Sequence, residues 1–450
     1  GEVTESGFPV VTEPLTLTIF ASQGSYNTAF EDVYILDKYE EMTGIAIEWI
    51  TVPSSAKTER ITLAFSSGDL PDAFLKCGLS ASMLQQYGES GDLIDLGPYL
   101  EKWAPSFNAY MQQYPDAQAA ITTPEGAIYS LPAAADANAT RMNKKFFWNQ
   151  SWLDKLGMTQ PTTVDELYAY AKAAMENDAN GNGEADEIPL SDSAGNLYYT
   201  FGGFFGAGNR GVAHNPEYDS DPQTGAVRHI KTSDAFRQAT ELMAKWYAEG
   251  IIDKEYLTYS DSYSVGLLVQ NRLGLYNYTN LAPVPADQVA SWVPTTGALT
   301  GPNGDTLWPF MRSHLHSVGA YAVTADCENV EAALRWVDYF YTNEGVIFYH
   351  YGIEGDTCVR QEDGSYKYAD FILDQITGDK GYDEVVGQYT AFPHGSNPTI
   401  MSWPGFSGME LTPETIQAAD AMYPASPEVV WPIFTYTTEE NEIVTTVGSD

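Results

Sequence analysis

The stretch LTLTIF, residues 15–20, alternates apolar and polar side chains. This alternation is typical of a β-strand with one buried face. A mostly polar, helix-prone segment follows, and TGIAIEWITV, residues 43–52, then places three large apolar side chains on one face of a second strand: Ile45, Ile47 and Trp49. A strand, a helix and a second strand in this order predict the β-α-β opening of an α/β sheet.

Three further segments carry helical periodicity. TTVDELYAYAKAAMEN, residues 162–177, begins with a predicted capping box in which Thr163 and Glu166 satisfy each other's backbone groups. Two more helices are predicted over 236–247 and 331–342. The tryptophans that fall on helical patterns are assigned to the core: Trp152, Trp246 and Trp336.

The bulk composition describes a large, acidic, globular chain. Its 450 residues suggest about two to four domains or one large two-lobed body. Hydrophobic residues make up 44 % of the chain, which is enough for a large core. The formal charge of −39 would repel nucleic acid and anionic membrane surfaces, so neither is an expected partner. No apolar run reaches the roughly 18–20 residues of a membrane span.

The cysteines exclude a disulfide scaffold. The chain has Cys77, Cys327 and Cys358 and no CxxC spacing, so at most one disulfide can form, and three buried or free thiols are the simpler interpretation. The sequence begins at Gly1 rather than at a methionine, which fits removal of an upstream signal segment.

The stretch DANGNGEADEIP, residues 178–189, resembles the first half of an EF-hand loop. Alternate residues would point oxygens at one centre, and Gly183 stands where such loops turn sharply. Pro189 stands where an EF-hand has its closing glutamate, so the closing carboxylates would come earlier. Oxygen donors suit Ca²⁺ and argue against zinc, and the alternative is a solvated turn. We expect a structural Ca²⁺ held by Asp178, Asn180, Asn182, Glu184 through its carbonyl, Asp186 and Glu187.

One long segment of the sequence resembles a known family. FFWNQSWLDKLGMTQPTTVDELYAYAKAAMENDANGNGEADEIPLS, residues 146–191, is similar to the extracellular solute-binding proteins, family 1, of ABC sugar importers. The subgroup is that of the LipO-like lipoproteins, which also resembles the alginate-oligosaccharide-binding proteins and carries a calcium loop of this kind. Weaker matching stretches lie on both sides of this segment, in the order that the family has them, at 67–74, 91–100, 126–132, 248–258 and 332–357.

The resemblance implies an α/β fold, a two-lobed periplasmic-binding-protein-like clamp with a ligand cleft and hinge crossings. Residues 1–14 would be a tether. The N-terminal lobe would take 15–135 and about 318–385, and the C-terminal lobe 136–317 and about 386–450. Hinge closure on the ligand would be the expected motion.

The resemblance also implies a location and partners. A family member would be extracellular, anchored by a lipid on a cysteine upstream of Gly1 to the outer face of the cytoplasmic membrane, and periplasmic in a Gram-negative cell. It would deliver its ligand to ABC permease subunits. We expect a monomer that binds no nucleic acid.

The candidate ligand contacts lie in loops and at strand ends that combine aromatic rings with polar groups, as sugar sites do. For each single ring, core packing is the competing interpretation, and a metal at His314 and His316 lacks a further ligand. Arginine and lysine are scarce, which favours a neutral oligosaccharide over a uronate. The candidates are Trp403, Trp308, Trp292, Tyr278, Asn27, Asp136, Arg141, His314 and His394.

Catalytic motifs are missing from the sequence. There is no GxSxG, HExxH, Walker loop or Rossmann fingerprint, and GGFFGAG at 202–208 lacks the GK[ST] of a phosphate-binding loop. We therefore expect a binding protein rather than an enzyme. A peptide-binding or sensor-partner protein is the alternative, and a carbohydrate-active enzyme is less favoured.

Overall fold

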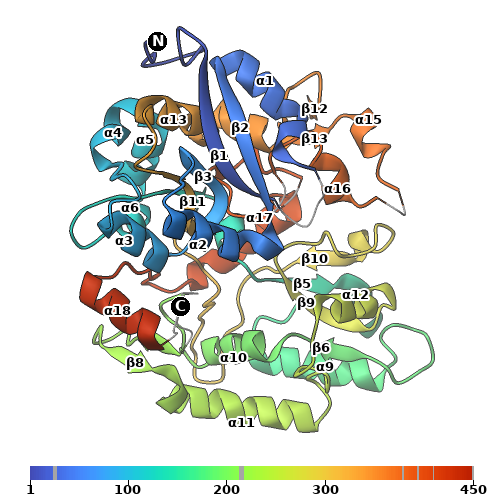
Figure 1. The fold of residues 1–450 in the computed structure, drawn as a ribbon. Coiled ribbons are helices and arrows are strands. Elements are labelled where there is room, and N and C mark those ends of the chain that lie inside the picture. The colour runs from blue at the N-terminus through green and yellow to red at the C-terminus, as the bar shows by residue number, and fades with distance from the viewer. Residues whose placement is uncertain (24–27, 212–216, 378–379, 393–394, 409, 448–450) are drawn as a thin grey trace. The chain divides into compact units, whose positions relative to one another are not determined.

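The computed structural model describes residues 1–23, 28–211, 217–377, 380–392, 395–408 and 410–447. The chain folds into two compact units, each built from several segments. The first unit comprises Gly1–Ala137, Ser313–Gly408 and Pro432–Asp450, and the second comprises Asn138–Arg312 and Met409–Trp431. Figure 1 labels the elements along the chain.

The first unit is organised around one mixed sheet, which has six strands in the described residues, in the order β14-β4-β11-β3-β1-β2. β11 is antiparallel to both of its neighbours, whereas the other pairings are parallel. Five strands therefore run in one direction, and their carboxyl ends lie at one edge. The strands are β1 (Leu15–Gln23), β2 (Ile45–Pro53), β3 (Ala73–Leu79), β4 (Leu131–Ala135), β11 (Leu315–Val323) and β14 (Ile400–Met401).

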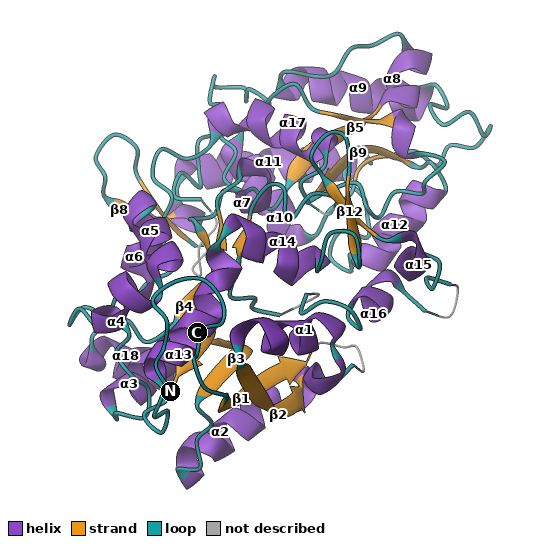
Figure 2. Cartoon of the chain, turned by 90° about the horizontal axis from the view of Figure 1, so that it is seen from above, coloured by secondary structure: helices purple, strands orange, loops and turns teal. Residues whose placement is uncertain are grey.

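Helices pack on both faces of this sheet. α1 and α2 lie on opposite faces (Figure 2), as right-handed crossovers from β1 to β2 and back across to β3 require. A small hairpin of β12 (Cys358–Arg360) and β13 (Tyr366–Tyr368) lies beyond α14. The helices of this unit are α1 (Tyr34–Thr43), α2 (Lys57–Ser67), α3 (Ala81–Glu89), α4 (Gly97–Trp103), α5 (Pro105–Gln113), α6 (Pro115–Ile121), α13 (Val330–Asp338), α14 (Asn343–Tyr351), α15 (Asp370–Leu373), α16 (Tyr382–Val386) and α18 (Thr438–Val447).

The predicted β-α-β opening is confirmed. β1 and β2 are parallel and in continuous register from Leu15 opposite Ile45 to Gln23 opposite Pro53. α1 connects them, and its C-cap is Gly44, whose φ of 75° is a left-handed conformation that glycine adopts without strain.

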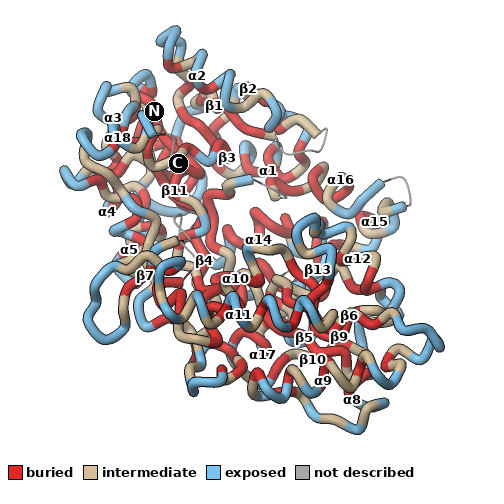
Figure 3. Tube along the Cα trace, turned by 90° about the horizontal axis from the view of Figure 1, so that it is seen from below, coloured by how far each residue is buried: buried red, intermediate tan, exposed pale blue. Residues whose placement is uncertain are grey.

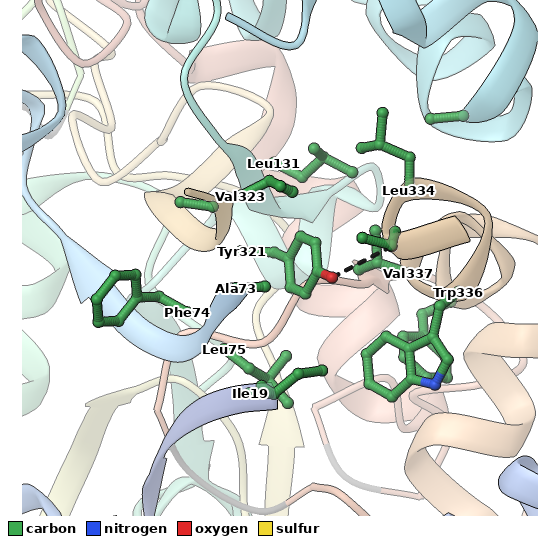
Figure 4. Close-up of a cluster of buried hydrophobic side chains, with 14 of the residues drawn as sticks. Ile19, Ala73, Phe74, Leu75, Leu131, Tyr321, Val323, Leu334, Trp336 and Val337 are labelled. Atoms are coloured by element: carbon green, nitrogen blue, oxygen red, sulfur yellow. Dashed lines mark hydrogen bonds between the residues drawn. The ribbon is translucent and has the colours of Figure 1, made fainter. Parts of the chain in front are cut away.

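The core of the first unit joins the sheet to α13. Ile19, Leu75 and Tyr321 from the strands face Trp336 and Val337 of the helix (Figure 4). The hydroxyl of Tyr321 donates to the carbonyl of Ala333 over 3.2 Å, so this buried polar group is satisfied. Most residues of the central strands are buried (Figure 3).

The second unit has a smaller sheet, with four strands in the described part of the chain in the order β10-β5-β9-β6. β5 runs against β9 and β10, and β6 runs parallel to β9. The strands are β5 (Lys145–Asn149), β6 (Ile188–Leu190), β9 (Leu273–Tyr278) and β10 (Trp292–Pro294), with a separate hairpin of β7 (Tyr218–Ser220) and β8 (Val227–His229). The helices are α7 (Asn138–Arg141), α8 (Gln150–Leu156), α9 (Val164–Glu176), α10 (Ala194–Gly203), α11 (Asp234–Ala248), α12 (Asp261–Val269) and α17 (Pro413–Met422).

The three helices predicted from periodicity are present as α9, α11 and α13, but α13 ends at Asp338 and a 3-10 helix, Tyr339–Tyr341, covers most of the rest of the predicted 331–342. At the start of α9, the Thr163 side chain accepts from the backbone of Glu166, as expected. The Glu166 carboxylate, however, accepts from the backbone and hydroxyl of Thr162 instead of from the backbone of Thr163. The second hydrogen bond of the capping box therefore goes to the residue before the predicted one. The core assignment of the helical tryptophans is confirmed: Trp152, Trp246 and Trp336.

Residues 1–14 do not form the predicted tether. Val10 and Val11 are buried, and their backbone amides donate to the carbonyl of Thr43. The guanidinium of Arg335 donates to the carbonyl oxygens of Thr4 and Gly7. Two short buried side chains give no periodic signal, so the sequence did not reveal this packing.

The compact units differ from the predicted lobes near the C-terminus. Residues 386–408 and 432–450 were expected in the C-terminal lobe but belong to the first unit. β14 pairs with β4 of the first sheet, and α18 packs on α3, which explains both assignments. In the described chain, no helix has the length and apolar character needed to span a bilayer.

Candidate functional site

The carboxyl ends of parallel strands are where open α/β sheets bind ligands, because loops and backbone dipoles meet there. In the second unit this edge carries the ends of β6 and β9 together with the start of β5, since Lys145 pairs with Tyr278. Residues from four segments meet at this edge. We call this set the Asp192 cluster; it consists of Lys144, Asp192, Asn196, Asn277 and Tyr278.

Asp192 lies at the centre of the cluster and is 1 % exposed. Its carboxylate accepts from the side-chain amide of Asn196 over 2.7 Å and from that of Asn277 over 2.9 Å. The Oδ1 atom of Asn277 is buried without a hydrogen-bond partner among the described residues. The cluster is therefore built polar and retains an acceptor for a further donor.

Lys144 provides the positive charge of the cluster. Its Nζ atom is 3.7 Å from Asp192 Oδ1 and donates to the carbonyl of Asn277 over 3.3 Å. The same atom lies 4.9 Å from the centre of the Tyr278 ring, within cation–π distance. Tyr278, one of the predicted contacts, is partly exposed and stacks on Tyr276 at 5.1 Å.

Burial raises the pKa of the Asp192 carboxyl, because the charged form loses its hydration. The Lys144 ammonium and the amide donors oppose this effect. Burial also raises the pKa of Tyr278, with the Asp261 carboxylate adding to the rise. An aromatic ring beside amides and one compensated ion pair is the composition expected of a site for a polyhydroxylated ligand.

The first unit gathers three predicted contacts at the matching edge of its sheet. Asp136 follows β4, Trp403 follows β14, and His314 precedes the antiparallel β11. β14 and β4 are paired from Ile400 opposite Ala134, so Asp136 and Trp403 leave neighbouring strand ends. The Trp403 ring is 41 % exposed.

His314 is fixed by its neighbours. Its backbone amide and its Nδ1 atom both contact the Asp116 carboxylate, at 2.8 and 2.9 Å, and its ring stacks on Tyr114 at 4.0 Å. The backbone carbonyl of His314 accepts from the amide of Ala135. Burial raises the pKa of Asp136, and His314 opposes this rise. Among the described residues, no group of three or more His, Cys, Asp or Glu side chains is placed to hold a metal, at His314 or elsewhere.

Three predicted contacts are buried inside the second unit. Trp292 is 3 % exposed and packs on Tyr276, and Trp308 is 1 % exposed and donates its indole N–H to the carbonyl of Lys144. Arg141 is also buried, and its Nε atom donates to the carbonyl of Arg312 over 3.1 Å. The prediction of Trp292 and Trp308 as ligand contacts is therefore corrected: both are core residues. Their loop-like sequence gave no sign of this burial. Asn27 and His394 lie outside the described residues.

The predicted calcium loop joins α9 to β6. Gly183 has a φ of 83° and donates its amide to Asp178 Oδ2 over 3.1 Å, which folds the loop on itself. The side-chain amides of Asn180 and Asn182 donate to Asp186 Oδ1 at 2.8 and 3.1 Å. Asp178 Oδ1 and Glu187 Oε2 are buried with no hydrogen-bond partner in the described residues. Buried carboxylate oxygens without partners are costly, and a cation would satisfy them. As it stands in this structure, the described loop does not gather three or more acidic side chains around one point.

The cations beside this loop come from elsewhere in the second unit. Arg272 Nε is 3.1 Å from Asp186 Oδ2, and Lys155 Nζ is 3.8 Å from Asp178 Oδ2.

The three cysteines are free and buried, so the simpler interpretation of the thiols is confirmed.

Comparison with known proteins agrees with this architecture. The sequence profile described as bacterial extracellular solute-binding protein matches residues 24–347, well over half of the chain. The chain belongs to this family. The match confirms the family predicted for this solute-binding protein.

Three curated relatives are similar over most of this chain. The fructooligosaccharide ABC transporter substrate-binding protein FusA of Streptococcus pneumoniae is 28 % identical over 72 % of this chain and 60 % of its own length. Lipoprotein LipO of Bacillus subtilis is 23 % identical over 71 % and 63 %. The polygalacturonan/rhamnogalacturonan-binding protein YtcQ of Bacillus subtilis is 23 % identical over 74 % and 64 %. The solute-binding protein thus spans less than two thirds of the length of each relative.

Solved structures share the fold. An HMO-binding, ABC-transporter-associated solute-binding protein of Bifidobacterium longum infantis has a TM-score of 0.71 at 20 % identity, covering 92 % of this chain and 85 % of its own. FusA with kestose has 0.70 at 22 %, covering 97 % and 89 %, and a FusA EF-hand mutant with fructo-nystose has also been solved. Alginate-binding AlgQ2 without calcium has 0.69 at 22 %, covering 97 % and 88 %. The predicted α/β, two-lobed solute-binding fold is confirmed.

Sequence reasoning missed most of the Asp192 cluster. It named Tyr278 but not Lys144, Asp192, Asn196 or Asn277. The available signal was position: Asp192 comes just after the EIPLS strand, and Lys144 precedes the FFWN strand.

Proposed function

We propose that this protein captures a neutral oligosaccharide and delivers it to the permease of an ABC importer. The Asp192 cluster is the observation that carries this proposal. It places the partly exposed Tyr278 ring and Asn196 side chain around the buried Asp192 carboxylate at the carboxyl edge of a sheet, where such folds bind ligands. The family membership and the named ligands of FusA support an oligosaccharide.

A neutral ligand fits the charges of the cluster. The Lys144 ammonium is 3.7 Å from the Asp192 carboxylate, so its charge is compensated by a buried partner. Asp261 adds a second carboxylate, whose Oδ2 atom is 3.5 Å from the Tyr278 hydroxyl. A uronate would meet these two carboxylates and a chain whose net charge is −39, and its carboxylates would be repelled.

The ligand would leave chemically unchanged. The relatives are named as binding proteins or as a lipoprotein rather than as enzymes, and the sequence has no catalytic motif. In the second unit the proposed ligand contacts are Tyr278 and the amide groups of the Asp192 cluster. In the first unit the predicted contacts Asp136, His314 and Trp403 are kept as separate candidates.

A glycan array followed by calorimetry tests this proposal. Purified protein should bind one or more neutral oligosaccharides, and the recovered sugar should be unaltered by mass spectrometry. Asn277→Ala should weaken binding while Tyr423→Ala, an exposed ring far along the chain from the cluster, should not. Binding of peptides without glycans would favour the peptide-binding alternative, and release of a cleaved sugar would favour an enzyme.

We propose that residues 178–187 hold a structural Ca²⁺. The donors would be Asp178, Asn180, Asn182, the carbonyl of Glu184, Asp186 and Glu187. The unpartnered oxygens of Asp178 and Glu187 support this assignment, as does the EF-hand of the FusA relative. When bound, the ion would join the end of α9 to the start of β6. It would take no part in ligand binding.

We also propose that the protein acts outside the cytoplasmic membrane as a monomer carrying a lipid anchor upstream of Gly1. The extracellular family supports the location. Labelling of the native lipoprotein with a radioactive fatty acid would test the anchor, and a label-free protein that partitions into the cytosol would contradict it.

A further inference from the structure

A cavity of about 390 Å³ opens on the second unit beside α10. It is bounded by α10, by the segment after α10, by the residue before β7, by the turn after β8 and by the start of α11 (Figure 1 labels α10, β8 and α11). Its volume lies within the range of small-molecule sites, about 300–1,000 Å³.

Two aromatic rings form one wall of the cavity. The rings of Tyr198 and Phe236 lie 5.6 Å apart with 29° between their planes. Tyr198 is 38 % exposed and Phe236 is partly exposed, so neither ring is used up by the core. The two rings stack on each other, and the exposed part of the pair offers an apolar surface to the C–H face of a sugar ring.

The other walls leave room and fix one polar group. A side chain at Gly195 would meet nothing within 4 Å, and one at Gly202 would make only ordinary contacts. The hydroxyl of Tyr199 accepts from Nη2 of Arg210 over 3.1 Å, and Arg210 is fully buried. A hydroxyl held in this way keeps its own hydrogen for an acceptor on a ligand.

The charges at the rim cancel. Glu217 and Lys231 both line the cavity and form an ion pair with each other. The rim therefore offers hydrogen bonds without a net charge, which suits a neutral hydroxylated ligand better than an ion.

The cavity and the Asp192 cluster share α10. Gly195 lines the cavity, and the next residue, Asn196, donates to Asp192. The lining positions Gly195, Tyr198 and Gly202 then follow at helical spacing, over about 10 Å of helix. A ligand chain that begins at the cluster would reach the cavity by following the first turns of α10.

We propose that this cavity binds a distal sugar unit of a neutral oligosaccharide and so makes affinity depend on chain length. This inference rests on the proposed oligosaccharide function. The units nearest Asp192 supply the anchor, and a unit stacked on Tyr198 and Phe236 adds affinity only when the chain is long enough to reach them.

Two variants change the cavity without touching the Asp192 cluster. Tyr198→Ala removes half of the aromatic wall, and Gly195→Leu adds a side chain at a lining position where a Cβ meets nothing within 4 Å. Tyr247→Ala is the matched control, because Tyr247 is an equally exposed ring on α11 that does not line the cavity. Thermal unfolding identifies any variant that fails to fold.

Calorimetry with fructo-, xylo- and gluco-oligosaccharides from disaccharide to pentasaccharide is the test. The wild-type affinity should rise with length in the series that binds. In Tyr198→Ala and Gly195→Leu the Kd for the longest member should rise about tenfold or more, a loss of about 1.4 kcal/mol, while the Kd for the shortest bound member stays within about twofold.

The outcomes separate this inference from the proposed function. If the wild type binds sugars and both variants match it at every length, the inference is wrong and the proposed function stands. An equal loss at every length would make the cavity part of the anchor and would also overturn length selection. If the wild type binds no saccharide, the proposed function and this inference fail together.

Discussion

The side-chain amide of Asn196 donates to the Asp192 carboxylate over 2.7 Å, which joins the first turn of α10 to the end of β6. Asn277 of β9 and Lys144 before β5 complete the surroundings of this carboxylate. One buried group therefore connects four segments of the second unit. Its removal should affect both stability and ligand binding.

Replacing Asp192 by alanine should destabilise the protein by roughly 2–4 kcal/mol, because a lysine and two amides lose a buried partner. Asp192→Asn is the matched control. The asparagine keeps one acceptor oxygen but carries no charge. Burial disfavours the charged form of Asp192, as the raised pKa of its carboxyl shows. Urea unfolding measures both changes. Equal stability of Asp192→Ala and the wild type would show that Lys144 and the amides have other partners.

Chelation should lower the melting temperature through the loop at 178–187. A metal that binds only the folded state stabilises it by about 2.7 kcal/mol at a hundredfold excess over Kd. Glu187→Gln should abolish the sensitivity to EDTA, since the buried carboxylate would be a ligand. Glu184→Ala should retain it, because Glu184 would bind through its carbonyl and its side chain is exposed.

Elemental analysis accompanies the melting curves. Wild type and Glu184→Ala should each contain calcium close to equimolar with protein, and Glu187→Gln should contain little. No metal in the wild type together with an unchanged curve in EDTA would mean that the loop is a solvated turn.

Stability should fall in acid partly because of His350. Burial lowers the pKa of His350 to about 3 from 6.5, and Lys76 adds to the lowering. Between these two values the unfolded chain carries a proton on His350 that the folded chain does not. The free energy of unfolding therefore decreases as the pH falls from about 6.5 toward about 3.

The variant His350→Leu removes this titration from a site lined by Phe392 and Phe406. Its free energy of unfolding should depend less steeply on pH over the same window, whatever its value at neutral pH. Urea titrations at several pH values measure the slope. Parallel curves for the variant and the wild type would show that His350 is protonated in the folded state.

The sequence predicted elements that depend on local pattern. Alternation in residues 15–20 and 43–52 was enough to predict β1 and β2, because a strand with one buried face repeats every second residue. The burial of Val10 and Val11 has no such repeat, and β14 is only two residues long. The burial of Val10 and Val11 and the strand β14 both depend on partners that are distant in the chain, so local pattern could not predict them.

The candidate site illustrates the same limit. Trp292 and Trp308 stand in loop-like sequence but are buried, because their neighbours Tyr276 and Phe146 come from other strands. Asp192 gave little signal by itself, since its role depends on Lys144, Asn196 and Asn277. The oxygen spacing in the 178–187 loop can be seen in the sequence because all of the proposed donors are local, and their role stays a prediction.

Trp403→Ala should weaken ligand binding while leaving the fold nearly unchanged. Trp403 leaves the strand end beside Asp136 and is 41 % exposed, so its ring supports little of the core. If the ring stacks on a sugar, its removal should cost about 2 kcal/mol or more, roughly thirtyfold in Kd. Phe371→Ala, which removes an exposed ring on α15, should retain wild-type affinity. Calorimetry and thermal melting measure both. Wild-type affinity in Trp403→Ala, or failure of that variant to fold, would make Trp403 a packing residue and would leave Asp136 and His314 as the predicted contacts of the first unit.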